Sequence, residues 1–162
     1  MLKKTNVFQV ANYIIEECHK KNINDLTNLK LQKLVYYARA HHLVLTKKQE
    51  KLVDYNFEAW DFGPVIPQLF QKIRQYVKPH KNITHTIPLT EKELTNEPLT
   101  PQQKTSIDHI IFKYGRKTGQ VLSLLTHNES PWYDVWEPDK AYSESIITDE
   151  AIYQYYLKDP IL

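Results

Sequence analysis

The sequence contains side chains that could act as acids, bases or metal ligands, but not in the spacings that such chemistry uses. The candidates are His41, His42, Glu58, Asp61 and His127. No HExxH, CxxC or GxSxG motif and no phosphate-binding loop is present. His41 and His42 would point about 100° apart on a helix, so they cannot chelate as a pair four residues apart can. We therefore expect no enzyme activity, no bound metal and no cofactor. His42 falls on an apolar stripe, where a hydrogen-bonded core histidine is expected.

An aromatic segment at residues 60–64 is the first candidate for binding another protein. Its candidate partner-binding residues are Trp60, Asp61, Phe62, Gly63 and Pro64. Gly63 suits a turn that needs positive φ, and Pro64 stiffens the chain that follows. Two interpretations stay open, because the segment could be a structural corner or a rigid aromatic loop that loses little entropy on binding.

The second candidate lies at residues 126–132. Its candidate partner-binding residues are Thr126, His127, Ser130, Pro131 and Trp132. Ser130 and Pro131 suit the start of a helix, which could simply be capped there or could bind an anion at its exposed amides. His127 could instead bond a backbone group and hold two helices at a fixed angle. We expect the two aromatic segments together to form the surface that faces a partner.

Two lysines complete the set of candidate partner-binding residues. Lys30 and Lys33 interrupt the apolar stripe around Leu34, so we expect them to share an outward face near the start of a helix. There they would be solvated or would meet an acidic patch on a partner. Together with Arg39 they could supply only a small phosphate-contacting strip. The chain carries 21 Lys and Arg against 19 acidic residues, so we do not expect a nucleic-acid partner.

The composition predicts one domain that stays in the cytoplasm. The 162 residues are 41% hydrophobic and 25% charged, which are ordinary globular values. No stretch approaches the roughly 20 apolar residues of a membrane helix, and the start MLKKTNVFQV lacks the apolar core of a signal peptide. The single Cys18 cannot form an internal disulfide. The 11 Tyr and 3 Trp favour a protein partner, because these residues most often anchor interfaces.

Apolar spacings of three and four residues predict a mainly α fold of about seven helices. The expected helical segments are 7–21, 27–45, 67–78, 100–115, 119–126, one that begins at Ser130 and one that Thr148 caps. Thr27 should cap the second, and Thr100 with Gln103 should form a capping box. We expect residues 57–67 to form a structured loop. An alternation over residues 83–89 predicts one edge strand that pairs with residues 57–60, which would give a small two-stranded β element.

Four blocks of sequence, in order, resemble the Panacea domain family, which includes SocA-like antitoxins and phage-associated GepA-like proteins. The blocks are VANYII at 10–15, TNLKLQKLVYYA at 27–38, FEAWDFGPVIP at 57–67 and THNESPW at 126–132. The resemblance covers roughly residues 7 to 156. Asp61 and Phe62 depart from the basic residue and Tyr that are usual in the family, and Ser130 stands where Gly is common.

The resemblance implies a single Panacea-like domain over residues 1–162 and a role as the antitoxin of a toxin–antitoxin pair. Such a protein would neutralise a cognate protein toxin by direct binding. The alternatives are an adaptor that delivers the toxin to a protease and a phage-encoded protein-binding module. None of these roles requires an active site.

Overall fold

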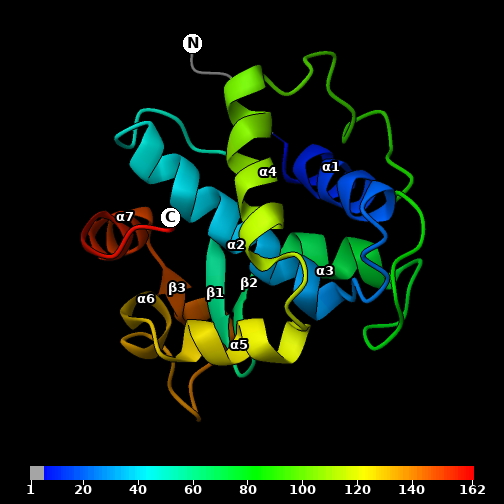
Figure 1. Cartoon of the computed structure of the whole chain (residues 1–162). Helices are drawn as coiled ribbons and strands as arrows, with labels where there is room; N and C mark the ends of the chain where they lie inside the picture. The colour runs from blue at the N-terminus through cyan, green and yellow to red at the C-terminus, as the bar shows by residue number, and fades with distance from the viewer. Residues whose placement is uncertain (1–5) are drawn as a thin grey trace.

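The computed structural model describes residues 6–162 and shows a mainly α fold, as predicted. Within this range there are seven α-helices, one 3-10 helix and three short strands (Figure 1). The elements are α1 (Val7–Lys20), α2 (Asn28–Leu45), β1 (Phe57–Trp60), β2 (Gly63–Val65), α3 (Pro67–Arg74), α4 (Pro101–Tyr114), α5 (Gly119–His127), α6 (Ser130–Tyr133), η1 (Tyr142–Glu144), β3 (Ile146–Ile147) and α7 (Asp149–Lys158). No helix in the described range is long and apolar enough to cross a membrane.

The helix ends follow local signals that the sequence carries. The Thr27 side chain accepts a hydrogen bond from the Lys30 amide at 3.3 Å, which caps α2. Thr100 and Gln103 form the expected reciprocal capping box at the start of α4. Thr148 caps α7 in the same way as Thr27 caps α2. The three predicted caps are therefore confirmed.

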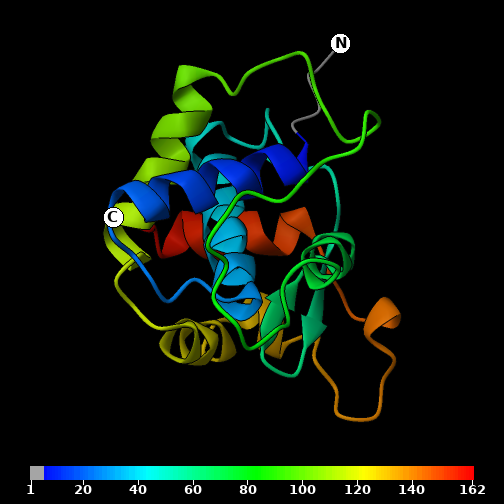
Figure 2. The ribbon, with the colours of Figure 1, turned by 90° about the vertical axis from the view of Figure 1, so that its right-hand side faces the viewer.

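Helix α2 runs through the middle of the molecule. It contacts α4, α5, α7, β2, α1 and α3, and these elements surround it in both views (Figures 1 and 2). The apolar stripe around Leu34 is fully buried, as expected. The prediction that Lys30 and Lys33 face outward is wrong, because both are fully buried. A helix with neighbours on every side has no solvated face, so its polar residues are buried with its apolar ones.

A small antiparallel sheet packs beside α2. Its strand order is β2-β1-β3, with Glu58 opposite Val65 in one pair and opposite Ile146 in the other. Residues 57–65 thus form a β-hairpin with Asp61 and Phe62 at its tip, and not the structured loop that the sequence predicts. The β element has three strands and not two.

The predicted strand over residues 83–89 is absent, and the prediction that it pairs with β1 is wrong. Residues 75–100 contain no helix or strand and run over α1 (Figure 2). Ile83 and Ile87 are buried, and their amides donate to the Leu26 carbonyl at 2.7 Å and to the Asn12 side chain at 2.8 Å. The apolar alternation therefore marks two anchor points of a long loop, not a strand.

Candidate functional site

The hairpin tip is fastened to α5 and to the segment around α6 by three side-chain hydrogen bonds. Ser123 Oγ donates to the Phe62 carbonyl at 2.7 Å. Trp132 Nε1 donates to the Trp60 carbonyl at 2.8 Å, and Trp136 Nε1 donates to Asp61 Oδ1 at 3.1 Å. The structure therefore brings the two aromatic segments at residues 60–64 and 126–132 together.

Stacked rings reinforce this junction. Trp60 stacks on Tyr142 with ring centroids 4.9 Å apart, and Trp132 stacks on Trp136 at 5.3 Å. His127 stacks on the same Trp132 ring at 4.1 Å. Because indole rings bury a large area and each Nε1 has found an acceptor, these contacts hold the tip in one conformation.

Gly63 occupies the turn with φ 110°, as its predicted role requires. A Cβ at this position would lie 2.5 Å from Lys33 Cε and 2.6 Å from Thr126 Oγ1. Lys33 Nζ donates to the Pro64 carbonyl at 3.0 Å, and burial lowers the pKa of this amine to about 7. The buried lysine thus supports the hairpin from inside the molecule.

Lys30 has a similar structural task one turn nearer the start of α2. Its Nζ donates to Asp25 Oδ1 at 2.6 Å and to the Gly115 carbonyl at 2.7 Å. These bonds join the segment before α2 to the end of α4. Lys30 and Lys33 therefore act inside the fold, and neither presents its ammonium group to a partner.

His127 anchors the tip from the end of α5. Its ring makes a hydrogen bond with the Asp61 backbone, as predicted, but this bond joins α5 to the hairpin and not to a second helix. Burial lowers the pKa of His127, and this outweighs the opposing effect of that bond. Its Nε2 is buried without a partner among residues 6–162. Nor does this range contain a group of three or more His, Cys, Asp or Glu side chains placed to hold a metal ion.

Glu129 carries a half-buried carboxyl group whose contacts the sequence did not reveal. Tyr37 Oη and Tyr156 Oη donate to Glu129 Oε1 at 2.7 and 3.0 Å. Burial raises the pKa of Glu129 to about 7, although the two hydroxyl donors oppose the shift. This carboxyl group joins α2, α7 and the start of α6. Its only sequence signal was its place in the THNESPW block.

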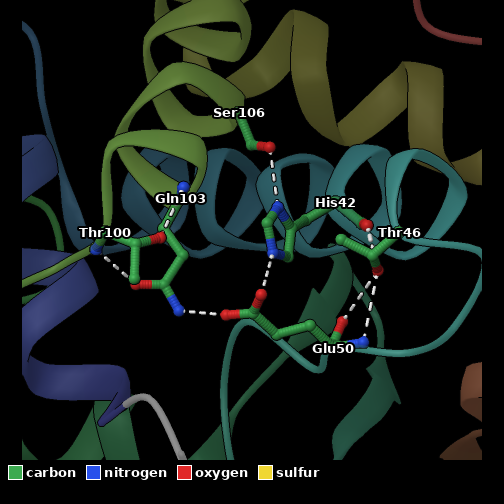
Figure 3. A network of polar contacts seen from close by, with 6 residues as sticks. All are labelled: His42, Thr46, Glu50, Thr100, Gln103 and Ser106. Atoms are coloured by element: carbon green, nitrogen blue, oxygen red, sulfur yellow. Dashed lines mark hydrogen bonds and ion pairs between the residues drawn. The ribbon is translucent and has the colours of Figure 1, made fainter.

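A second polar network lies between α2 and α4 and has the order of groups found in a nucleophilic triad (Figure 3). His42 Nδ1 lies 2.7 Å from Ser106 Oγ, and His42 Nε2 lies 3.3 Å from Glu50 Oε2. Glu50 also accepts a hydrogen bond from the Gln103 side chain, which ties it to the α4 capping box. Ser106 and His42 are fully buried, so no substrate could reach the serine. The prediction that His42 is a hydrogen-bonded core residue is confirmed.

Only part of the predicted contact set reaches solvent. Asp61 and Phe62 are exposed; Trp60, His127 and Ser130 are partly buried; Gly63, Pro64, Thr126, Pro131, Trp132, Lys30 and Lys33 are buried. The sequence did not indicate two exposed neighbours of this set. They are Leu124 and Tyr133, which are 62% and 52% exposed. Four of the five residues 121–125 are apolar, and such a run cannot bury every member on one side of a helix. That pattern could have indicated Leu124.

Comparison with known proteins identifies the family. The family model for the SocA-like antitoxin, Panacea domain, matches residues 31–133, which is more than half of the chain. The chain belongs to this Panacea domain family. The matched Panacea region runs from α2 to the end of α6 and includes the hairpin, Lys33, His127 and Glu129.

One similar Panacea protein is Antitoxin SocA of Caulobacter vibrioides (strain NA1000 / CB15N). It is 29% identical over 128 residues, which cover 76% of this chain and 66% of the relative. The match therefore spans just under two thirds of the relative's length. No solved structure matches the chain.

Proposed function

We propose that this Panacea-domain protein is an antitoxin that neutralises a protein toxin by binding it directly. Membership of the SocA-like antitoxin family and the similarity to Antitoxin SocA support this role. In this proposal residues 1–162 work as one domain in the cytoplasm. In this proposal the protein acts by binding and not by catalysis, because Ser106 and His42 are fully buried.

The contact surface in this proposal is the hairpin-tip surface, defined as Asp61, Phe62, Leu124, Tyr133 and Trp136. The observation that carries the proposal is that the Phe62 side chain is 68% exposed on a backbone whose carbonyl is bound by Ser123. Leu124 follows Ser123, and Tyr133 follows the Trp132 that binds the other side of the tip. Apolar rings held rigidly before contact lose little entropy on binding and are typical interface anchors.

The experiment compares two exposed phenylalanines. Phe62→Ala removes the ring at the tip, and Phe112→Ala removes a ring on α4 that is 85% exposed. Neither ring supports the core, so both variants should melt like the wild type. Affinity for the purified toxin, encoded by the adjacent reading frame, should fall about thirtyfold in Phe62→Ala, for a loss of about 2 kcal/mol. Phe112→Ala should bind as the wild type does.

Growth rescue in co-expression provides the second measurement. Wild-type chain and Phe112→Ala should rescue cells from the toxin, and Phe62→Ala should rescue poorly. A loss of binding in Phe112→Ala alone would place the interface on α4 and refute the hairpin-tip surface. Rescue that disappears in cells lacking the main ATP-dependent proteases would favour the adaptor role over direct neutralisation.

A further inference from the structure

The charges of the chain are distributed unevenly, and the hairpin tip lies in the acidic part. The whole chain has a formal charge of +2. From Thr118 to Thr148, however, Lys140 is the only Lys or Arg. The exposed acidic residues of this segment are Asp134, Glu137, Asp139 and Glu144. Glu58 and Asp61 lie on the hairpin, where Glu58 is partly exposed and Asp61 is exposed. The positive charge of the chain therefore lies elsewhere.

The segment that carries most of these carboxylates is attached along the hairpin. The Ala59 amide donates to the Ser145 carbonyl at 2.8 Å, and Tyr142 stacks on Trp60. Trp136 binds Asp61 at the tip itself. Trp136 is thus fixed to the tip and residues 142–145 to strand β1, so the acidic segment between them is attached to the hairpin that carries Phe62.

The carboxylates of this segment have no cation of the described chain within ion-pair distance. Six acidic residues elsewhere are within 4 Å of a Lys, Arg or His nitrogen; they are Glu17, Asp25, Glu50, Glu93, Asp149 and Glu150. In the described part of the chain no such contact is made by Asp61, Asp134, Glu137, Asp139 or Glu144. The carboxylates attached to the hairpin are therefore not paired with a cation of the described chain.

We propose that the hairpin-tip surface takes a basic partner, a toxin face whose Lys and Arg side chains surround an apolar pocket for Phe62. The proposal rests on the proposed function and specifies the chemistry of its partner. The ring supplies affinity, whereas the exposed carboxylates steer a cationic surface toward it and repel acidic proteins and nucleic acids. Pairs formed at such an exposed rim raise the association rate more than they lower the dissociation rate.

The test reverses charge at two places while changing the net charge equally. Glu137→Lys with Asp139→Lys alters the acidic surround of the tip. Glu16→Lys with Glu91→Lys is the matched control, because both residues are exposed on other elements and make no ion pair with a described residue. Both double variants should melt like the wild type. Stopped-flow association with the protein encoded by the adjacent reading frame is measured at low and high salt.

We expect the tip variant to associate about tenfold more slowly than the wild type at low salt, with a dissociation rate changed less than about threefold. The difference should vanish at high salt, and the control should keep the wild-type rate. Equal slowing of both variants would mean that only net charge matters and would overturn the proposal. Unchanged rates in the tip variant, with Phe62→Ala still defective, would overturn it while leaving the proposed function intact. Failure of the wild-type chain to bind would refute the proposed function itself.

Discussion

Charged side chains are buried and hydrogen-bonded on helix α2, whereas those described around the hairpin-tip surface are exposed and unpaired. In α2 the cations Lys30, Lys33 and Arg39 are buried, and each donates to a carbonyl or carboxylate of another element. At the tip and on the segment attached to it, carboxylates such as Asp61, Asp134 and Glu137 are exposed and form no ion pair in the described structure. The first arrangement joins elements that are far apart in sequence. The second leaves charge available to a partner.

The difference shows that position in a family motif does not reveal what a charge does. Buried ion pairs pay a desolvation cost that their attraction roughly offsets, so the cations of α2 fix the arrangement of elements more than they add stability. Exposed charges cost little in folding and add little to affinity. They do attract or repel an approaching molecule over about a Debye length. Lys33 lies directly beneath the tip and connects the two regions.

The largest effect should come from the apolar stripe of α2. Leu34→Ala removes a fully buried side chain and should lower the free energy of unfolding by about 2 to 5 kcal/mol. Leu124→Ala, at the exposed tip, should change it by less than about 0.5 kcal/mol. Urea unfolding of both variants provides the measurement. Similar losses in the two would mean that Leu124 also belongs to the core and would remove it from the hairpin-tip surface.

An intermediate effect is expected at the glycine between the two regions. Gly63→Ala places a Cβ against Lys33 Cε and Thr126 Oγ1 at positive φ, and should destabilise the fold by about 2 to 4 kcal/mol. Gly119→Ala is the matched control, because its Cβ would meet its nearest neighbours at 3.4 Å, an ordinary contact distance. Thermal melting should therefore separate the two variants clearly. If Gly63→Ala and Gly119→Ala had the same melting temperature, the close packing of Lys33 under the hairpin would be wrong.

The smallest effect is a pH dependence that originates at Lys33. Its pKa is lowered by burial from 10.5 to about 7 in the folded protein, so the unfolded chain binds more protons between these values. The contribution of Lys33 to the free energy of unfolding is therefore largest above about pH 10.5. It decreases as the pH falls and reaches its lowest value below about pH 7. Between pH 9 and pH 7 the loss should be on the order of 2 kcal/mol.

Lys33→Met should remove this dependence. The free energy of unfolding of the variant, relative to that of the wild type, should therefore increase as the pH is lowered from 9 to 7. Urea unfolding at both pH values measures the change, and using the difference from wild type cancels other titrating groups. Lys117→Met, at an exposed lysine, is the control and should follow the wild type at both pH values. Parallel behaviour of all three proteins would show that Lys33 keeps an ordinary pKa in the fold.

The sequence by itself determined the local features of this protein. The ends of α2, α4 and α7 follow from Thr27, Thr100 and Thr148, because a cap bonds amides only three residues away. The positive φ of Gly63 and the backbone bond of His127 were also foreseen. The family resemblance, carried by four short blocks, was confirmed over residues 31–133.

Only the tertiary structure decided what each polar residue faces. Lys33 is buried because α5 and the hairpin cover the side of α2 that spacing alone would leave in water, and a helical period cannot count the neighbours of a helix. The strand over residues 83–89 failed for a related reason, since Ile83 and Ile87 bond to Leu26 and Asn12, which are distant in sequence. The grouping of Phe62 with unpaired carboxylates depends on contacts between residues 59–62 and 123–145. Such long-range pairings leave no periodic trace in a sequence, so the candidate site could be assembled only from the folded chain.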